Sequence, residues 1–130
     1  MLLDVLGADA RFGERSREAL REAFAAGALV ACEVVWEEVR AHFRDDDECR
    51  DVFTRLGIRF DALALETAML AGRLWRAYRE RTRGLRTRVV ADFVIGAHAL
   101  READALLTRD RGFYRGYFGE LRVIDPAGDA

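Results

Sequence analysis

Residues 89–110 read VVADFVIGAHALREADALLTRD, and this stretch decides the fold class. Its first part, 89–103, is the most apolar helical segment of the chain, and the short apolar run 105–107 predicts a buried strand. A polar turn, 108–110, follows the strand. A helix joined to a fully apolar strand is typical of parallel sheets whose two faces are covered by helices.

The same alternation of helices and short strands extends along the rest of the chain. Carboxylates at 45–48 predict a helix start, because they interact favourably with the positive end of the helix dipole. Asp61 is predicted to cap the long helix that follows it. Further helices are expected at 10–26, 33–43 and 63–83, and one more from the acidic cluster 45–48 to Gly57; Gly27 and Gly84 end the first and the last of them. Further strands are expected at 28–32, 58–60 and 121–124, the last reached through the aromatic, glycine-punctuated segment 113–118. We therefore expect an α/β three-layer sandwich, in which a short parallel sheet is flanked by helices.

Length and composition predict one soluble domain over residues 1–130. Half of the residues are hydrophobic (51%), 34% are charged, and the net charge is −2. This balance excludes a uniformly basic nucleic-acid coat and a polybasic membrane binder. No signal peptide and no apolar run of the roughly 20 residues that a membrane span needs are present, so we expect a cytoplasmic protein with no membrane partner. Cys32, Cys49, His42 and His98 match no metal-ligand spacing, and both histidines are expected to be structural or surface residues.

Asp92 is the first candidate site residue. It interrupts an apolar run, where an acid is costly to bury unless it is paired or bound to a metal ion. Its alternative role is an interaction with the helix dipole or an ion pair with Arg86 or Arg88. Gly96 and Ala99, one and two turns later, are expected to leave space beside the carboxylate.

Asp110 and Glu38 are the other two candidates. Asp110 directly follows a predicted strand, and ligands of parallel sheets bind at the carboxyl ends of the strands; an ordinary turn aspartate is the alternative. Glu38 lies at the margin of the buried face of its helix, with Glu33 and Glu37 as competitors and a solvated helix face as the alternative for all three. Acids from two helices and one strand end would form an oxygen cage that suits magnesium or manganese better than zinc.

Arginine is concentrated near these acids. All 21 basic residues are arginine, a bias that codon usage in a GC-rich genome also explains. Seven arginines and one acid, Glu80, lie between Arg73 and Arg88, and the polar turn adds Arg109, Arg111 and Arg115, interleaved with Phe113, Tyr114 and Tyr117. An acidic metal site with a basic rim and stackable aromatic rings is typical of enzymes that cleave single-stranded nucleic acid, although a solvated helix face explains the arginines equally well.

From about Leu56 to Pro126 the chain resembles a PIN domain of the VapC toxin type. The motifs that carry this resemblance are VVADFVIGAHA (89–99), ADALLTRDRGFY (103–114) and, more loosely, VVWEEV (34–39). The resemblance implies a metal-dependent ribonuclease in which Glu38, Asp92 and Asp110 are catalytic and bind Mg²⁺ or Mn²⁺. It also implies a toxin that is held inactive by a small VapB-type antitoxin, and a homodimer.

The chain departs from the family at its start. PIN domains open with a strand that ends in Asp-(Ser/Thr)-(Asn/Ser)-Val-Leu, whose aspartate belongs to the metal site, whereas this chain begins MLLDVLG. Asp4 could take that role, but Val5 and Leu6 do not fit the polar pair that should follow. We expect instead that the first strand and the first aspartate are absent, through an internal start codon, which would leave strand edges exposed.

The function predicted from the sequence is therefore metal-assisted hydrolysis of RNA phosphodiester bonds by a toxin of the VapC type. Arg109 and Arg111 are the expected phosphate contacts, and Thr108 is expected to orient Asp110. The alternative is a catalytically impaired PIN-like module that binds its antitoxin or RNA without cleavage. A nuclease of the same fold that acts on DNA or on a particular nucleic-acid structure is a further alternative.

Overall fold

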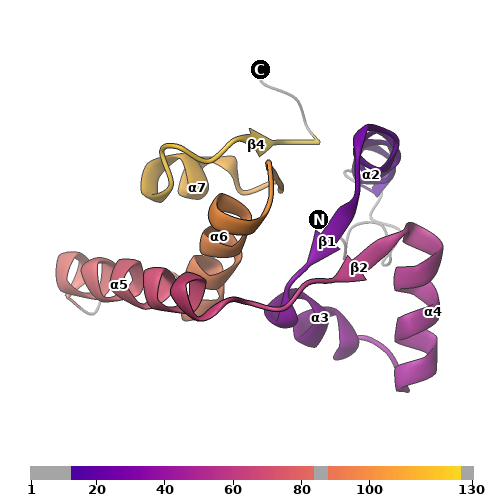
Figure 1. The fold of residues 1–130 in the computed structure, drawn as a ribbon, viewed down its shortest axis with the longest axis horizontal. Helices are drawn as coiled ribbons and strands as arrows, with labels where there is room; N and C mark the ends of the chain where they lie inside the picture. The colour runs from indigo at the N-terminus through magenta and orange to yellow at the C-terminus, as the bar shows by residue number, and fades with distance from the viewer. Residues whose placement is uncertain (1–12, 84–87, 127–130) are drawn as a thin grey trace.

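The computed structural model describes residues 13–83 and 88–126, in which six helices and four short strands alternate (Figure 1). The elements are α2 (Gly13–Ala26), β1 (Leu29–Ala31), α3 (Glu33–Arg40), α4 (Asp46–Leu56), β2 (Ile58–Phe60), α5 (Leu65–Thr82), α6 (Val90–Glu102), β3 (Leu106–Leu107), α7 (Arg111–Tyr117) and β4 (Val123–Ile124). The prediction of a helix-rich α/β fold with short parallel strands flanked by helices is confirmed. The described residues do not include Gly84, Arg86 or residues 1–12. The predictions about Asp4 and about the absence of a first strand therefore lie outside them.

Local signals end α4 where the sequence predicts. The Asp45 carboxylate accepts a hydrogen bond from the Glu48 backbone N–H (2.8 Å), which satisfies one of the unpaired donors at the helix start. Gly57 ends the helix in the left-handed region, at φ 72°. A Cβ on Gly57 would lie 2.5 Å from the Phe24 ring, so both the backbone and the packing require glycine there.

Two predictions about local structure are wrong. Asp61 does not cap α5, whose N-cap residue is Ala64; the Asp61 side chain is instead hydrogen-bonded to His98. Segment 113–118 is not only a link to the last strand, because most of it belongs to helix α7. Its aromatic rings are buried against α6, and this packing outweighs the low helix propensity of its glycines.

The four described strands form two parallel pairs and not the single sheet that the sequence predicts. Leu29–Ala31 pairs in register with Ile58–Phe60, and Leu106–Leu107 pairs with Val123–Ile124. Parallel neighbours need a crossover connection, which α3 and α4 supply to the first pair and α7 to the second. The molecule therefore has two halves, joined by the loop 61–64 between β2 and α5 (Figure 1).

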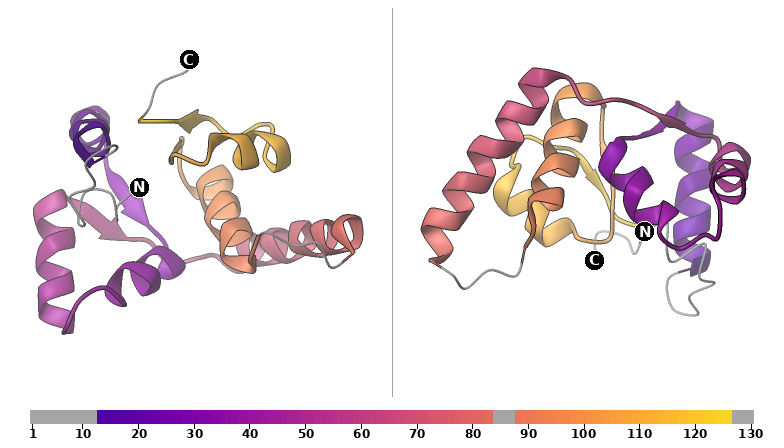
Figure 2. Two further views of the ribbon diagram at one scale, coloured as in Figure 1. Left: turned by 180° about the vertical axis from the view of Figure 1, so that it is seen from behind. Right: turned by 90° about the horizontal axis from the view of Figure 1, so that it is seen from below.

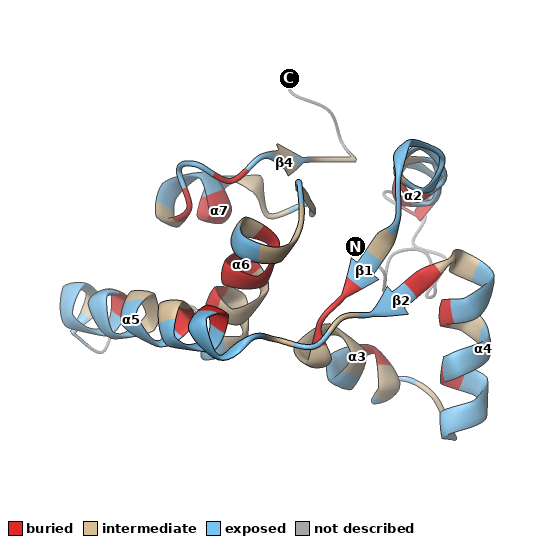
Figure 3. Cartoon of the chain, in the orientation of Figure 1, coloured by how far each residue is buried: buried red, intermediate tan, exposed pale blue. Residues whose placement is uncertain are grey.

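Each half has its own hydrophobic core. The first is built on β1, β2 and the helices around them, with Phe53 fully buried against Trp36. The second lies between α5, α6 and α7; there Phe93 is fully buried among the rings of Trp75, Tyr78, Phe113 and Tyr117. α5 packs along α6 and leaves its other face exposed (Figures 2 and 3). The two halves meet where α3 contacts α6 and where Leu107 packs against the first core.

Candidate functional site

The three predicted acids come from three different parts of the chain. Glu38 is on α3, Asp92 is in the first turn of α6, and Asp110 immediately precedes α7. Burial raises the pKa of Tyr114, and the negative charges of Asp92, Asp110 and Glu38 raise it further. The charges of the three acids thus act on one phenol, and α3, which carries Glu38, contacts α6, which carries Asp92.

Glu38 is in an environment that disfavours its negative charge. Partial burial raises the pKa of the Glu38 carboxyl, and the nearby charges of Asp92 and Glu37 raise it further. The negative charges of Glu38 and Asp92 therefore repel each other, and a bound cation would reduce this repulsion.

Asp92 is anchored by its own helix. Its Oδ2 accepts a hydrogen bond from the Val89 backbone N–H (3.1 Å), so the residue holds the first turn of α6 in place. The alternative ion pair with Arg88 is not formed, because that guanidinium is directed to Asp110. The space expected at Gly96 is filled by the Phe118 ring, since a Cβ on Gly96 would lie 2.4 Å from it.

Asp110 is paired with Arg88, a partner that the sequence analysis did not find. Both carboxylate oxygens accept from the guanidinium; Nη1 contacts Oδ2, and Nη2 lies 3.2 Å from Oδ1. The guanidinium also lies 4.4 Å from the centre of the Phe113 ring. The Asp110 backbone N–H donates to Thr108 Oγ1 (3.1 Å), so Thr108 contacts Asp110 through the main chain.

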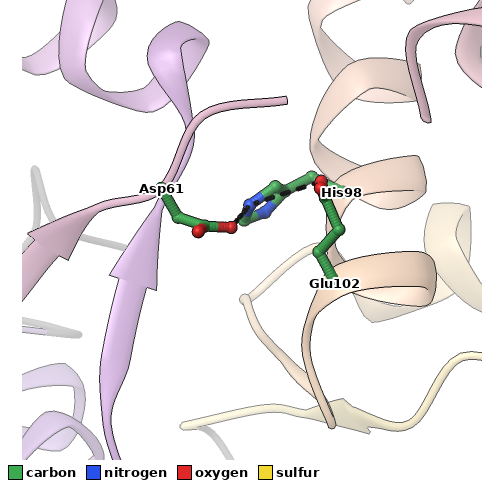
Figure 4. Close-up of side chains that lie close together, drawn as sticks. All are labelled: Asp61, His98 and Glu102. Carbon is green, nitrogen blue, oxygen red and sulfur yellow. Dashed lines mark hydrogen bonds and ion pairs between the residues drawn. The ribbon is translucent and has the colours of Figure 1, made fainter. Parts of the chain in front are cut away.

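A second cluster, Asp61, His98 and Glu102, lies at the other end of α6 (Figure 4). Each of these side chains offers one ligand atom, and the three atoms lie within 4.8 Å of one another, close enough to share one metal ion. All three belong to the described residues. Glu38, Asp92 and Asp110 do not form such a group among the same residues. A physical reason is that Arg88 occupies the carboxylate of Asp110. Their roles as metal ligands and catalytic residues stay predictions.

His98 is a structural residue, as the sequence predicts, but the sequence analysis did not find its acidic partners. The residue is buried and has two acidic neighbours, Asp61 and Glu102. One signal was available, because Glu102 follows His98 by four residues and so lies on the same helix face. Asp61 precedes His98 by 37 residues, and no spacing rule connects the two.

The family model for the PIN domain matches residues 2–119 of the 130 in the chain. The chain belongs to the PIN domain family. PIN domains are typically metal-dependent nucleases, and they usually use a divalent ion. None of the curated proteins compared with the chain matches it.

The arginines of this PIN domain differ in their exposure and in their contacts. α5 exposes Arg73, Arg76, Arg79 and Arg81, and the Arg81 guanidinium lies 5.2 Å from the centre of the Tyr117 ring. Of the predicted phosphate contacts, Arg109 is exposed, whereas Arg111 is half-buried with its Nε 3.7 Å from Asp125 Oδ2. Their contact with phosphate stays a prediction. No helix of the described residues has the length and apolar character that crossing a bilayer requires.

Proposed function

We propose that this PIN domain is a Mg²⁺- or Mn²⁺-dependent endoribonuclease of the VapC toxin type, which hydrolyses RNA phosphodiester bonds and is inhibited by a small VapB-type antitoxin. Family membership supports nuclease chemistry. The observation that carries the proposal is the match of residues 2–119 to the PIN domain family, and the contact of α3 with α6, the helices that carry Glu38 and Asp92, supports it.

The donor set fits a small, hard divalent cation. Carboxylate oxygens are the ligands that Mg²⁺ and Mn²⁺ prefer, and the repulsion that raises the pKa of Glu38 would be offset by a positive ion. Glu38 and Asp92 would hold such an ion directly, and Asp110 would join them once its carboxylate is released from Arg88. A bound ion of this kind supplies an activated water and stabilises charge on the attacked phosphate.

The residues of the chain have separate tasks in this proposal. Asp92 is fixed by its hydrogen bond to Val89, so its position does not depend on a ligand. Arg88 neutralises Asp110 and, when displaced, is close enough to contact an incoming phosphate oxygen. Arg109 and Arg111 hold the RNA backbone, and Thr108 fixes the turn that carries Asp110.

The surface around the acids favours single-stranded RNA as the substrate. The exposed arginines of α5 would attract the phosphate backbone, and Arg81 lies beside the Tyr117 ring. Unpaired bases can stack on aromatic rings and guanidinium planes, which duplex bases cannot do.

The test is a cleavage assay with purified protein on single-stranded RNA, structured RNA, single-stranded DNA and duplex DNA. We expect cleavage of RNA with Mg²⁺ or Mn²⁺, loss of cleavage in EDTA, and a fall of at least about a hundredfold in Asp92→Asn, because the site loses a charged ligand. Glu38→Gln and Glu37→Gln are a matched pair on adjacent positions of α3; only the first is expected to lose activity.

One observation favours a second candidate, a PIN-like module that binds RNA or an antitoxin without cleavage. The Arg88–Asp110 contact occupies an acid that a nuclease needs. Equal background cleavage in the wild-type protein and Asp92→Asn, together with retained RNA binding, would select this candidate. If the protein cleaved DNA and not RNA in this assay, the proposed substrate would be DNA.

A further inference from the structure

The cluster of Asp61, His98 and Glu102 joins the two halves of the molecule. Asp61 begins the loop that leaves β2, whereas His98 and Glu102 are one turn apart on α6 (Figure 4). His98 Nε2 lies 2.6 Å from Asp61 Oδ2 and 3.9 Å from Glu102 Oε2. One imidazole nitrogen and two carboxylate oxygens thus converge from elements that are distant in the sequence.

The second oxygen of Glu102 is the unusual feature of this cluster. Glu102 Oε1 accepts a hydrogen bond from the Ala64 backbone N–H (3.2 Å), but Oε2 is buried and has no hydrogen-bond partner. A buried carboxylate oxygen without a partner is costly, and a cation between it and His98 would remove that cost. The His98 side chain is only 6% exposed, so the ring is held in position before any ion binds.

The ligand types identify the class of ion. Imidazole nitrogen with two carboxylates is a zinc-type ligand set, and three protein ligands leave a fourth position for water, whereas Mg²⁺ prefers oxygen alone. Ligand atoms around a tetrahedral zinc ion lie about 3.4 Å apart, given bonds of about 2.0–2.2 Å. This separation falls between the two distances found here, so small movements of the two carboxylates around the fixed imidazole would suit the ion.

We propose that Asp61, His98 and Glu102 form a Zn²⁺ site that fastens the loop after β2 to α6 and leaves the fourth position of the ion to water. Zinc binding requires the lone pair of His98 Nε2, so the contact between Nε2 and Asp61 is exchanged for one bond from each group to the ion. Asp61 is 40% exposed and provides the route by which the ion enters.

This site is separate from the acids of the proposed nuclease. His98 and Glu102 follow Asp92 by six and ten residues on one helix, which places them about 9 and 15 Å farther along its axis. Zinc binding therefore does not rest on the proposed function, and a variant that lacks the Asp92 carboxylate should retain it.

The test measures Zn²⁺ binding by calorimetry and thermal unfolding, with Asp92→Asn as the background so that the nuclease acids do not contribute. We expect Zn²⁺ at a hundred times its dissociation constant to raise Tm by about 5–10 °C, and Mg²⁺ to give a much smaller shift. Glu102→Gln should weaken Zn²⁺ binding at least about tenfold. It retains an oxygen for the Ala64 N–H and removes a buried charge, so the metal-free variant is expected to fold.

The chain contains only two histidines, which gives a matched control. His42 is exposed and follows the end of α3, whereas the loop contacts Glu33 at the start of that helix, and His42→Ala should bind Zn²⁺ as the Asp92→Asn background does. In NMR spectra, Zn²⁺ should shift the ring signals of His98 and leave those of His42 in place. Unchanged Zn²⁺ affinity in Glu102→Gln, or Zn²⁺ binding that leaves the His98 signals unmoved, would overturn the proposal.

Discussion

The Arg88 guanidinium contacts both carboxylate oxygens of Asp110, 22 residues later in the chain. The two side chains are 30% and 42% exposed, so water weakens the pair but does not abolish it. Hydrogen bonding to Asp110 raises the pKa of Arg88, so the guanidinium stays charged throughout the working pH range. A metal ion that uses Asp110 must therefore compete with an arginine of the same chain.

Arg88→Gln is expected to increase the Mn²⁺ affinity of the acids about fivefold, because release of a partly exposed ion pair corresponds to about 1 kcal/mol. Calorimetric titration with Mn²⁺ measures the change. Arg76→Gln is the matched control, since Arg76 forms an exposed ion pair with Glu80 on α5 (Nε–Oε1 3.0 Å). Equal or weaker Mn²⁺ binding in Arg88→Gln would show that Arg88 does not compete for Asp110.

Glu38 makes the stability of the metal-free protein depend on pH. Its pKa is raised above the ordinary value of 4.5 in the folded state, so the folded chain holds this proton more tightly than the unfolded chain. The free energy of unfolding consequently falls as the pH rises from about 4.5 through the raised pKa. Glu38→Gln should not show this fall in unfolding free energy. The variant should therefore be more stable than the wild-type protein at pH 7, and the difference should vanish below about pH 4.5.

Urea unfolding in EDTA over a pH series checks this prediction. Glu22→Gln, an exposed change on α2, serves as the control and should leave the pH profile unaltered. A pH profile of Glu38→Gln that is parallel to that of the wild-type protein would contradict the assignment.

Gly96 sets the distance between α6 and the Phe118 ring. Gly96→Ala would place a Cβ 2.4 Å from that ring and is expected to cost about 1–3 kcal/mol of unfolding free energy. Gly72→Ala is the matched control inside α5, where nothing lies within 4 Å of a new Cβ; it should stabilise the protein by about 0.5–1 kcal/mol. Thermal unfolding distinguishes the two, and the same sign for both changes would refute the packing argument.

Asp45 is expected to stabilise α4 through its hydrogen bond to Glu48. Asp45→Ala should cost about 1 kcal/mol, whereas Asp47→Ala, an acid in the first turn that does not cap the helix, should cost less than half of that. Denaturant unfolding measures both values. Equal losses would mean that charge near the helix start matters more than the cap.

The sequence by itself determined the order of the described helices and strands apart from α7, and the ends of α4. Asp45 and Gly57 act on residues within one helical turn, so their effects can be read without knowledge of the rest of the fold. Asp92, set in an apolar run, and Asp110, directly after a strand, were likewise found from their immediate neighbours.

Tertiary structure alone decided which charged groups meet. Arg88 with Asp110, and Asp61 with His98, are separated by 22 and 37 residues, and their contacts follow from how α6 packs against the loop 61–64 and the start of α7. The division of the described strands into two parallel pairs was likewise decided by the tertiary structure. Pairing between distant segments depends on the summed burial of many side chains, and no local pattern encodes that sum.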